Sequence, residues 1–327
     1  MHIPEGFINL PTSLGAAALA GGSVWASLRV ASRDLKDRLV PFAGLTAAFI
    51  FALQMLNFPV AAGTTGHLLG GALAAILLGP WLGIVAVTVV VVIQALLFAD
   101  GGLVAMGLNV INMAVVTALV GWYVFRAVVK VLPRRPGVLI GALAGAWASV
   151  VASSIGFAAQ YAVGGVGGVD PGLVFSSMVG VHALVGIGEG LITAAAVGAV
   201  LTARPDLVTG TRGLDDLEQA ATSLSRKAAG SFVSAGLAVA VALVVFVAPI
   251  AGSDPDGLER VAEDTGFAAT AEDNAYSGPL ADYGVAGLDN DALGTIIAGM
   301  VGTGLTFAAG MILVGFARRR SHPAEVA

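Results

Sequence analysis

The sequence contains no cysteine and few charged residues. The absence of cysteine excludes disulfides, thiolate metal ligands and cysteine nucleophiles. Charged residues make up 11% of the 327 residues, whereas soluble globular chains carry roughly 25%. Hydrophobic residues make up 57%, and the mean hydropathy is +0.90. Most of the chain is therefore expected to lie in lipid, as a multi-pass protein of the cell membrane.

Lysine is also scarce, which limits how the chain can use nucleotides. Lys36, Lys130 and Lys227 are followed by Asp, Val and Ala, whereas a phosphate-binding P-loop needs Gly-Lys followed by Ser or Thr. We therefore expect no nucleotide to bind to this chain. No basic run lies outside the expected membrane flanks, so nothing indicates nucleic-acid binding. Residues 1–10 lack lysine and arginine, which argues against a signal peptide and predicts that the N-terminus is retained.

Long apolar segments are abundant, and nine of them predict membrane-spanning helices. They lie near residues 11–31, 41–58, 64–80, 82–99, 103–125, 137–163, 174–202, 229–250 and 292–316. A helical protein is favoured over a barrel, because barrel strands have about ten residues with strict alternation. Several segments are shorter than the ~20 residues that a spanning helix needs. Glycine accounts for 45 residues, about twice its usual share, which favours closely packed helices.

The positions of lysine and arginine indicate how the chain is oriented. If the N-terminus is outside, all but one of the 16 basic residues lie in inner loops or at the inner helix ends, and the exception is Arg260. This distribution follows the positive-inside rule and supports an odd number of spans. We therefore expect the N-terminus outside, the C-terminus inside, and an acidic outer loop over residues 251–291.

The predicted fold is an all-α membrane protein in two units. Residues 1–203 carry seven of the spans, and residues 204–228 form a polar cytoplasmic linker. Residues 229–317 form a hairpin of two spans around the acidic loop, and residues 318–327 form a cytoplasmic tail. This gives a seven-helix bundle followed by a two-helix hairpin, with about nine spans.

The first seven residues, "MHIPEGF", suggest a metal site. Met1 and His2 offer three nitrogens that chelate one ion in a plane: the α-amine, the His2 amide and the His2 imidazole. Nickel(II) and copper(II) promote loss of the amide proton and favour planar nitrogen sites. One position in that plane remains for another ligand, and a second histidine would fill it. The alternative is a disordered chain end.

The remaining histidines are His67, His182 and His322. His322 lies in the predicted cytoplasmic tail. His67 lies in "AAGTTGHLLGG", at the outer end of the third predicted span, on the same side as the N-terminus. His67 is therefore the candidate for the fourth metal ligand. The alternative is that it only caps a helix or binds a carbonyl oxygen.

Five further polar residues lie in otherwise apolar segments: Asp100, Asn109, Asn112, His182 and Glu189. The first three lie in "FADGGLVAMGLNVIN" and are candidates to order the N-terminal segment or to bond to the metal ligands, or else to cap a helix. His182 and Glu189 are seven residues apart and share one helix face. They form either a proton or metal relay or a polar pair that fixes helix packing.

Four blocks of the sequence, in order, resemble the NikM/CbiM substrate-binding component of energy-coupling-factor transporters for nickel and cobalt. They are "MHIPEGF", "GTTGHLLGGALAAILLGPW", "QALLFADGGLVAMGLNVINMAV" and "HALVGIGEGLIT", and the resemblance covers residues 1 to about 203. The resemblance implies that the metal is held by the N-terminal amine, by the amide and imidazole of the second residue, and by the histidine of the Gly-His-Leu block. Met1, His2 and His67 match these positions one by one.

The second unit resembles the small accessory component of the same transporters. "DPDGLERVAEDTGF" is similar to the PDGLE motif of that NikN/CbiN-like domain, so the chain is interpreted as a fusion of both components. The resemblance implies Ni²⁺ or Co²⁺ as the transported substrate and no enzymatic activity. It also implies two kinds of partner: a transmembrane coupling protein of NikQ/CbiQ type and a pair of cytoplasmic ATPases of NikO/CbiO type.

Two alternatives from other functional classes remain at this point. One is a stand-alone secondary carrier of divalent metals in which His182 and Glu189 pass protons. The other is an intramembrane hydrolase that uses Ser153 or Ser154 with His182, although the chain has no Gly-x-Ser-x-Gly sequence. Nitrogen ligands in a plane favour nickel over cobalt, but the resemblance covers transporters of both ions.

Overall fold

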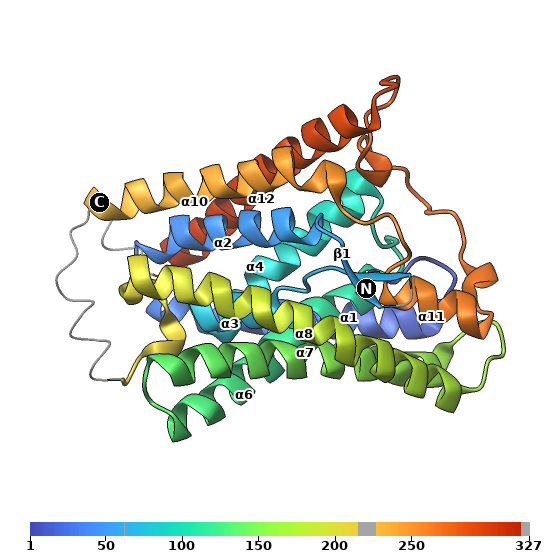
Figure 1. Cartoon of the computed structure of the whole chain (residues 1–327), viewed down its shortest axis with the longest axis horizontal. Coiled ribbons are helices and arrows are strands. Elements are labelled where there is room, and N and C mark those ends of the chain that lie inside the picture. The colour runs from blue at the N-terminus through green and yellow to red at the C-terminus, as the bar shows by residue number, and fades with distance from the viewer. Residues whose placement is uncertain (62, 215–226, 322–327) are drawn as a thin grey trace.

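The computed structural model describes residues 1–61, 63–214 and 227–321 (Figure 1). Helices dominate the described residues, and the only sheet among them is a two-stranded antiparallel hairpin. His322, most of the predicted tail and residues 215–226 of the predicted linker lie outside the described residues. The all-α prediction is therefore confirmed for the part of the chain that the structure describes.

The first unit contains the hairpin and most of the helices. Its elements are α1 (Leu10–Ala31), α2 (Leu39–Gln54), β1 (Phe58–Ala61), β2 (Thr64–Gly66), α3 (Gly71–Leu78), α4 (Pro80–Ile93), α5 (Met106–Asn109), α6 (Thr117–Val131), α7 (Arg135–Gly164) and α8 (Pro171–Ala203). Two π-helical segments, η2 (Gln94–Phe98) and η3 (Val110–Val116), extend α4 and join α5 to α6. Short 3₁₀ turns are η1 (Ser32–Asp34), η4 (Pro205–Leu207) and η5 (Thr209–Thr211).

The second unit is a helical hairpin whose two long helices are joined by an irregular segment. Its elements are α10 (Lys227–Phe246), η6 (Ala248–Ile250), α11 (Gly257–Thr265), η7 (Ala268–Thr270), η8 (Ala281–Tyr283) and α12 (Asp291–Ser321). The segment between η6 and α12 leaves the long helices and reaches back to the N-terminus, where α11 lies beside the first residues (Figure 1).

Helix starts follow local sequence rules. The side chain of Asn9 accepts a hydrogen bond from Thr12 N (3.1 Å) at the start of α1, and Asp170 does the same for Leu173 N (2.9 Å) at the start of α8. Proline follows each cap, where its missing N–H costs no helical bond. Ile8, just before the α1 cap, pairs with Gly165, which lies between α7 and the α8 cap.

Seven helices of the described residues are long and apolar enough to cross a membrane, which confirms a multi-pass membrane protein. The predicted span at 41–58 is a helix of 16 residues, α2. The predicted span at 64–80 is wrong, because β2 and a turn occupy its first half and α3 has only 8 residues. Every residue of α3 is buried, so its apolar character reflects burial inside the protein and not contact with lipid.

The two units pack against each other along α2. Both α10 and α12 contact α2, while α6, α7 and α8 pack side by side on the other part of the molecule. Gly44 of α2 allows the close approach, since a Cβ atom there would lie 2.7 Å from the main-chain oxygen of Phe307 in α12. This contact is the small-residue packing that the glycine content predicts.

Candidate functional site

The N-terminal segment is buried inside the protein and is not a free chain end. Met1 is 3% exposed and Ile3 is fully buried. The side chain of Asn109 binds both main-chain groups of Ile3: Ile3 N donates to Oδ1 (2.8 Å), and Nδ2 donates to the Ile3 carbonyl (3.1 Å). Asn109, which the sequence suggested as a support for this segment, therefore holds the main chain one residue beyond His2.

Glu5 and Gly6 complete this attachment, and the sequence analysis assigned neither of them a role. The carboxylate of Glu5 accepts hydrogen bonds from Val104 N (3.2 Å) and Ala275 N (3.1 Å), which belong to the two different units. Gly6 has a φ of +90°, and a Cβ atom there would lie 2.0 Å from the carbonyl oxygen of Thr270. Only glycine fits this position, so the Gly in "MHIPEGF" allows the second unit to cross directly over the first residues.

The amine of Met1 lies against His67. The amine nitrogen is within hydrogen-bonding contact of His67 Nε2. His67 Nδ1 lies 3.0 Å from the carbonyl oxygen of Leu68. A carbonyl oxygen only accepts, so Nδ1 carries the ring proton and Nε2 presents its lone pair to the amine. The Met1 amine and the His67 ring therefore lie in contact in the structure.

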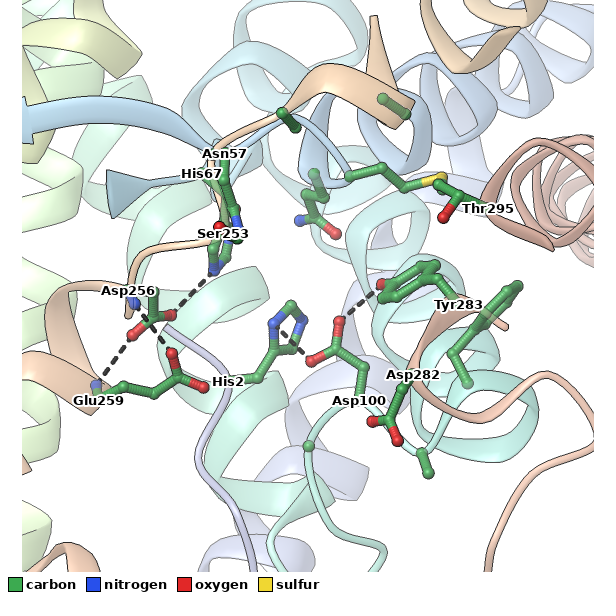
Figure 2. Close-up of a pocket in the computed structure, with 18 of the residues that line it drawn as sticks. His2, Asn57, His67, Asp100, Ser253, Asp256, Glu259, Asp282, Tyr283 and Thr295 are labelled. Atoms are coloured by element: carbon green, nitrogen blue, oxygen red, sulfur yellow. Dashed lines mark hydrogen bonds and ion pairs between the residues drawn. The ribbon is translucent and has the colours of Figure 1, made fainter. Parts of the chain in front are cut away.

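His2 stacks on His67 at the centre of Figure 2. The ring centroids are 5.1 Å apart and the rings are inclined by 17°. His2 Nδ1 lies 3.1 Å from Asp100 Oδ1, and Nε2 lies 3.2 Å from Gln94 Oε1. Burial lowers the pKa of His2 to about 4, against the raising effect of Asp100. The ring is therefore neutral near pH 7, which is the form that binds metal ions.

Tyr283 of the second unit bridges the two polar groups that flank the His2 ring. Its hydroxyl donates to Asp100 Oδ2 (2.6 Å) and accepts from Gln94 Nε2 (3.2 Å). Asp100 and Gln94 are the two groups within hydrogen-bonding distance of the His2 imidazole, so Tyr283 orients both of them. Figure 2 shows the contact of Tyr283 with Asp100. The sequence analysis selected Asp100 but missed Gln94 and Tyr283. Apolar neighbours surround Gln94, and Tyr283 lies almost 200 residues away in the acidic loop.

Asp256 of the PDGLE sequence reaches the same point from the other side. Its Oδ2 lies 2.7 Å from the Met1 amine nitrogen and 3.4 Å from His67 Nε2. Burial alone would raise the pKa of this carboxyl, but the positive charge of the Met1 amine holds it well below its usual range. The sequence predicted only an acidic outer loop here and gave no sign of this contact, although it showed the PDGLE motif.

The remaining candidates are Glu189, His182 and Asn112. Glu189 accepts hydrogen bonds from Leu69 N (2.7 Å) and Gly70 N (3.0 Å), so it fixes the turn that follows His67. His182 Nδ1 lies 2.9 Å from the carbonyl oxygen of Met178, one turn earlier in α8. The side chains of Glu189 and His182 therefore bind separate main-chain groups. Asn112 exchanges two hydrogen bonds with Gln160 of α7 (2.8 and 3.1 Å) and packs η3 against that helix.

A cavity of about 600 Å³ opens beside these residues and is lined by both units. His2, His67, Asp100, Asp256 and Tyr283 contribute to its wall (Figure 2). Within the described ranges, no group of three or more His, Cys, Asp or Glu side chains is arranged to hold a metal ion. The candidate site differs from such clusters of side chains, because two of its nitrogens belong to the main chain.

The comparisons with known proteins cover both units. Residues 2–207 match the CbiM family, described as the cobalt uptake substrate-specific transmembrane region, and residues 230–319 match the PDGLE domain. The chain belongs to the CbiM family. In this CbiM-family protein a PDGLE domain follows in the same chain, as the resemblances of the two units implied.

Relatives with the same fused arrangement are known. A protein of Archaeoglobus fulgidus named putative fused nickel transport protein NikMN is 38% identical over 323 residues, which is 97% of this chain and 99% of that protein. The fused nickel transport protein NikMN of Rhodobacter capsulatus is 30% identical over 348 residues, which cover 94% of this chain and 95% of that protein. These CbiM-family relatives are transport proteins, which confirms the prediction that the chain is not an enzyme.

A solved structure supports the same assignment for the first unit. A crystal structure described as a truncated transition metal transporter has a TM-score of 0.54 and 29% sequence identity, and it covers 62% of this chain and 99% of the solved one. The CbiM-family bundle thus has a counterpart of known structure.

Proposed function

We propose that this chain captures Ni²⁺ or Co²⁺ on the outer side of the membrane and acts as the substrate-specific component of an ATP-driven uptake transporter. The contact between the Met1 amine and His67 Nε2 carries this proposal. It brings together two potential ligands that are 66 residues apart in the sequence. The relatives that are named nickel or cobalt transport proteins support the choice of ions.

The proposed ligands are four nitrogens: the Met1 amine, the His2 amide, the His2 imidazole and His67 Nε2. The first three form adjoining chelate rings, and His67 is already in contact with one of them. His2 Nδ1 faces Asp100, so the imidazole has to exchange this partner for the ion when the ion binds. A planar nitrogen set favours nickel(II) over cobalt(II), and we propose nickel as the preferred ion.

Asp100, Asn109 and Glu189 have positioning roles in this proposal. Asn109 fixes the main chain after His2, Asp100 contacts the His2 ring, and Glu189 fixes the turn after His67. The carboxylate oxygens of Glu189 each accept a main-chain N–H, so we assign Glu189 to this support and not to the proton relay of a stand-alone carrier. For His182 and Asn112 we propose packing roles.

Two further parts of the proposal concern the division of labour. The first unit, residues 1–203, holds the ion, and the PDGLE unit, residues 229–317, covers it from outside. Since the sequence has no P-loop, we propose that a transmembrane coupling protein and a pair of cytoplasmic ATPases supply the energy. Metal uptake by cells that express the chain should then require both partners, whereas a secondary carrier would work alone.

The direct test is calorimetric titration of the purified full-length protein with Ni²⁺ and Co²⁺. His67→Ala should lower nickel affinity on the order of 100-fold, because it removes the one nitrogen ligand that does not come from the chain end. His322→Ala is the matched control and should leave the affinity unchanged. Equal affinities of the His67→Ala variant and the wild type would contradict the proposed site.

A further inference from the structure

Asp256 Oδ2 lies close to two of the proposed nitrogen ligands. The Met1 amine nitrogen and His67 Nε2 are neighbours in the proposed nitrogen plane, and Oδ2 is 2.7 Å from the first and 3.4 Å from the second. With metal–ligand bonds of about 2 Å, an oxygen at right angles to a metal–nitrogen bond is about 3 Å from that nitrogen. The two distances lie on either side of this value, so the carboxylate oxygen is close enough to both nitrogens to reach an ion bound between them.

The carboxylate of Asp256 is held in this position by its other oxygen. Oδ1 accepts hydrogen bonds from Leu258 N (2.7 Å) and Glu259 N (3.0 Å) at the start of α11, and the Glu259 side chain accepts from Asp256 N (2.9 Å). This capping box uses one carboxylate oxygen and leaves the other free. Oδ2 therefore faces the amine and His67 without a competing role in the helix.

The segment that carries Asp256 is also attached to the segment that carries His67. Thr65 N donates to the Pro255 carbonyl (3.0 Å), and Thr65 Oγ1 donates to the Asp254 carbonyl (2.8 Å). Thr65 precedes His67 by two residues, and Pro255 precedes Asp256 directly. The two side chains are thus presented by paired stretches of main chain, one from each unit.

Charge balance favours a carboxylate at this point. A divalent ion bound to a deprotonated amide and neutral nitrogens would leave a net positive charge of one in a buried site. An isolated buried charge is costly unless it is paired. Asp256 lies beside the Met1 amine and Asp100 lies beside His2 Nδ1, so carboxylates on both sides of the site offset this charge.

We propose that Asp256 binds the captured ion through Oδ2, so that the PDGLE unit contributes an oxygen ligand to the site of the CbiM-type unit. This inference rests on the proposed metal site. It gives the PDGLE unit a direct part in ion selection. A plane of four nitrogens alone prefers nickel(II), and an apical oxygen reduces this preference because cobalt(II) accepts a fifth ligand more readily.

The test compares Asp256→Asn with Asp254→Asn in the full-length protein loaded with Ni²⁺. Asparagine keeps an oxygen for the helix cap and replaces the free oxygen by an NH₂ group, which cannot bind the ion. Asp254→Asn removes the same charge two residues away. Asp256→Ser keeps a capping hydroxyl without a carboxylate, and its result should agree with that of Asp256→Asn.

Two readouts are expected to change together. X-ray absorption at the nickel edge should show the pre-edge peak of planar nickel(II) in the two Asp256 variants and no such peak in the wild type or Asp254→Asn. Nickel affinity should fall on the order of 10- to 100-fold in the Asp256 variants only. A planar signature in the wild type, with equal affinity in all variants, would overturn the inference but leave the nitrogen site intact. A wild type that binds no nickel would overturn the proposed function itself.

Discussion

At the scale of single residues, the site depends on side chains that fix main-chain nitrogens. The amine of Met1 is a useful ligand only if the first residues adopt one conformation, and ordering a chain end costs conformational entropy. Asn109 offsets this cost with two hydrogen bonds to Ile3, and Glu5 adds two more to the neighbouring loops. The sequence indicated Asn109 because an amide in an apolar segment needs partners, whereas Glu5 gave no signal beyond its position near the start.

Asn109→Leu tests this attachment. The substitution leaves the N–H and the carbonyl of Ile3 without partners, which should cost about 1–3 kcal/mol of stability. Nickel affinity should fall on the order of 10- to 100-fold, because the proposed ligands lose their support.

Asn112→Leu is the matched control for this substitution. Asn112 is equally buried, but its partner is Gln160 and not the N-terminal segment. The control should lower the unfolding temperature without changing the nickel affinity. Equal losses of affinity in both variants would show that general destabilisation, and not the N-terminal attachment, is the cause.

At the scale of elements, hydropathy located most helices but misread one segment. The predicted spans at 137–163 and 174–202 agree with α7 and α8 within a few residues, because these helices are long and have proline in their first two residues. The segment 64–80 is equally apolar, but it combines a strand, the turn with His67 and the short buried helix α3. Hydropathy does not distinguish burial in protein from contact with lipid, so this element could not be predicted from apolarity alone.

Glu189→Gln tests whether α8 supports the turn after His67. The carboxylate now accepts hydrogen bonds from Leu69 N and Gly70 N. In the variant, the NH₂ group would face one of these two N–H donors, and that hydrogen bond would be lost. We expect a loss of about 1–3 kcal/mol in stability and a roughly tenfold loss of nickel affinity, because His67 shifts.

Thr193→Val is the control on the same helix. The hydroxyl of Thr193 is buried and has no hydrogen-bond partner, so its removal should leave both stability and affinity near the wild-type values. If Glu189→Gln binds nickel normally but abolishes uptake, the support role is wrong and a proton relay through α8 is favoured.

At the scale of the whole molecule, the site lies where the two units meet. The sequence predicted both units and the ligand candidates Met1, His2 and His67, because the motifs are local. It did not predict that Asp256 and Tyr283 of the second unit contact the same site. Such contacts depend on how α10 and α12 pack on α2, and the sequence carries no local signal for packing between helices so distant along the chain.

The most direct test of this account is to extend the chain by one glycine before Met1 and to titrate the protein with Ni²⁺. The extension converts the Met1 amine into an amide and places an extra residue where the buried chain end meets His67 and Asp256. The same glycine added after Ala327 serves as the control. We predict that nickel affinity falls on the order of 100-fold or more with the N-terminal glycine only. Equal nickel affinity in the two extended proteins would contradict the proposed site.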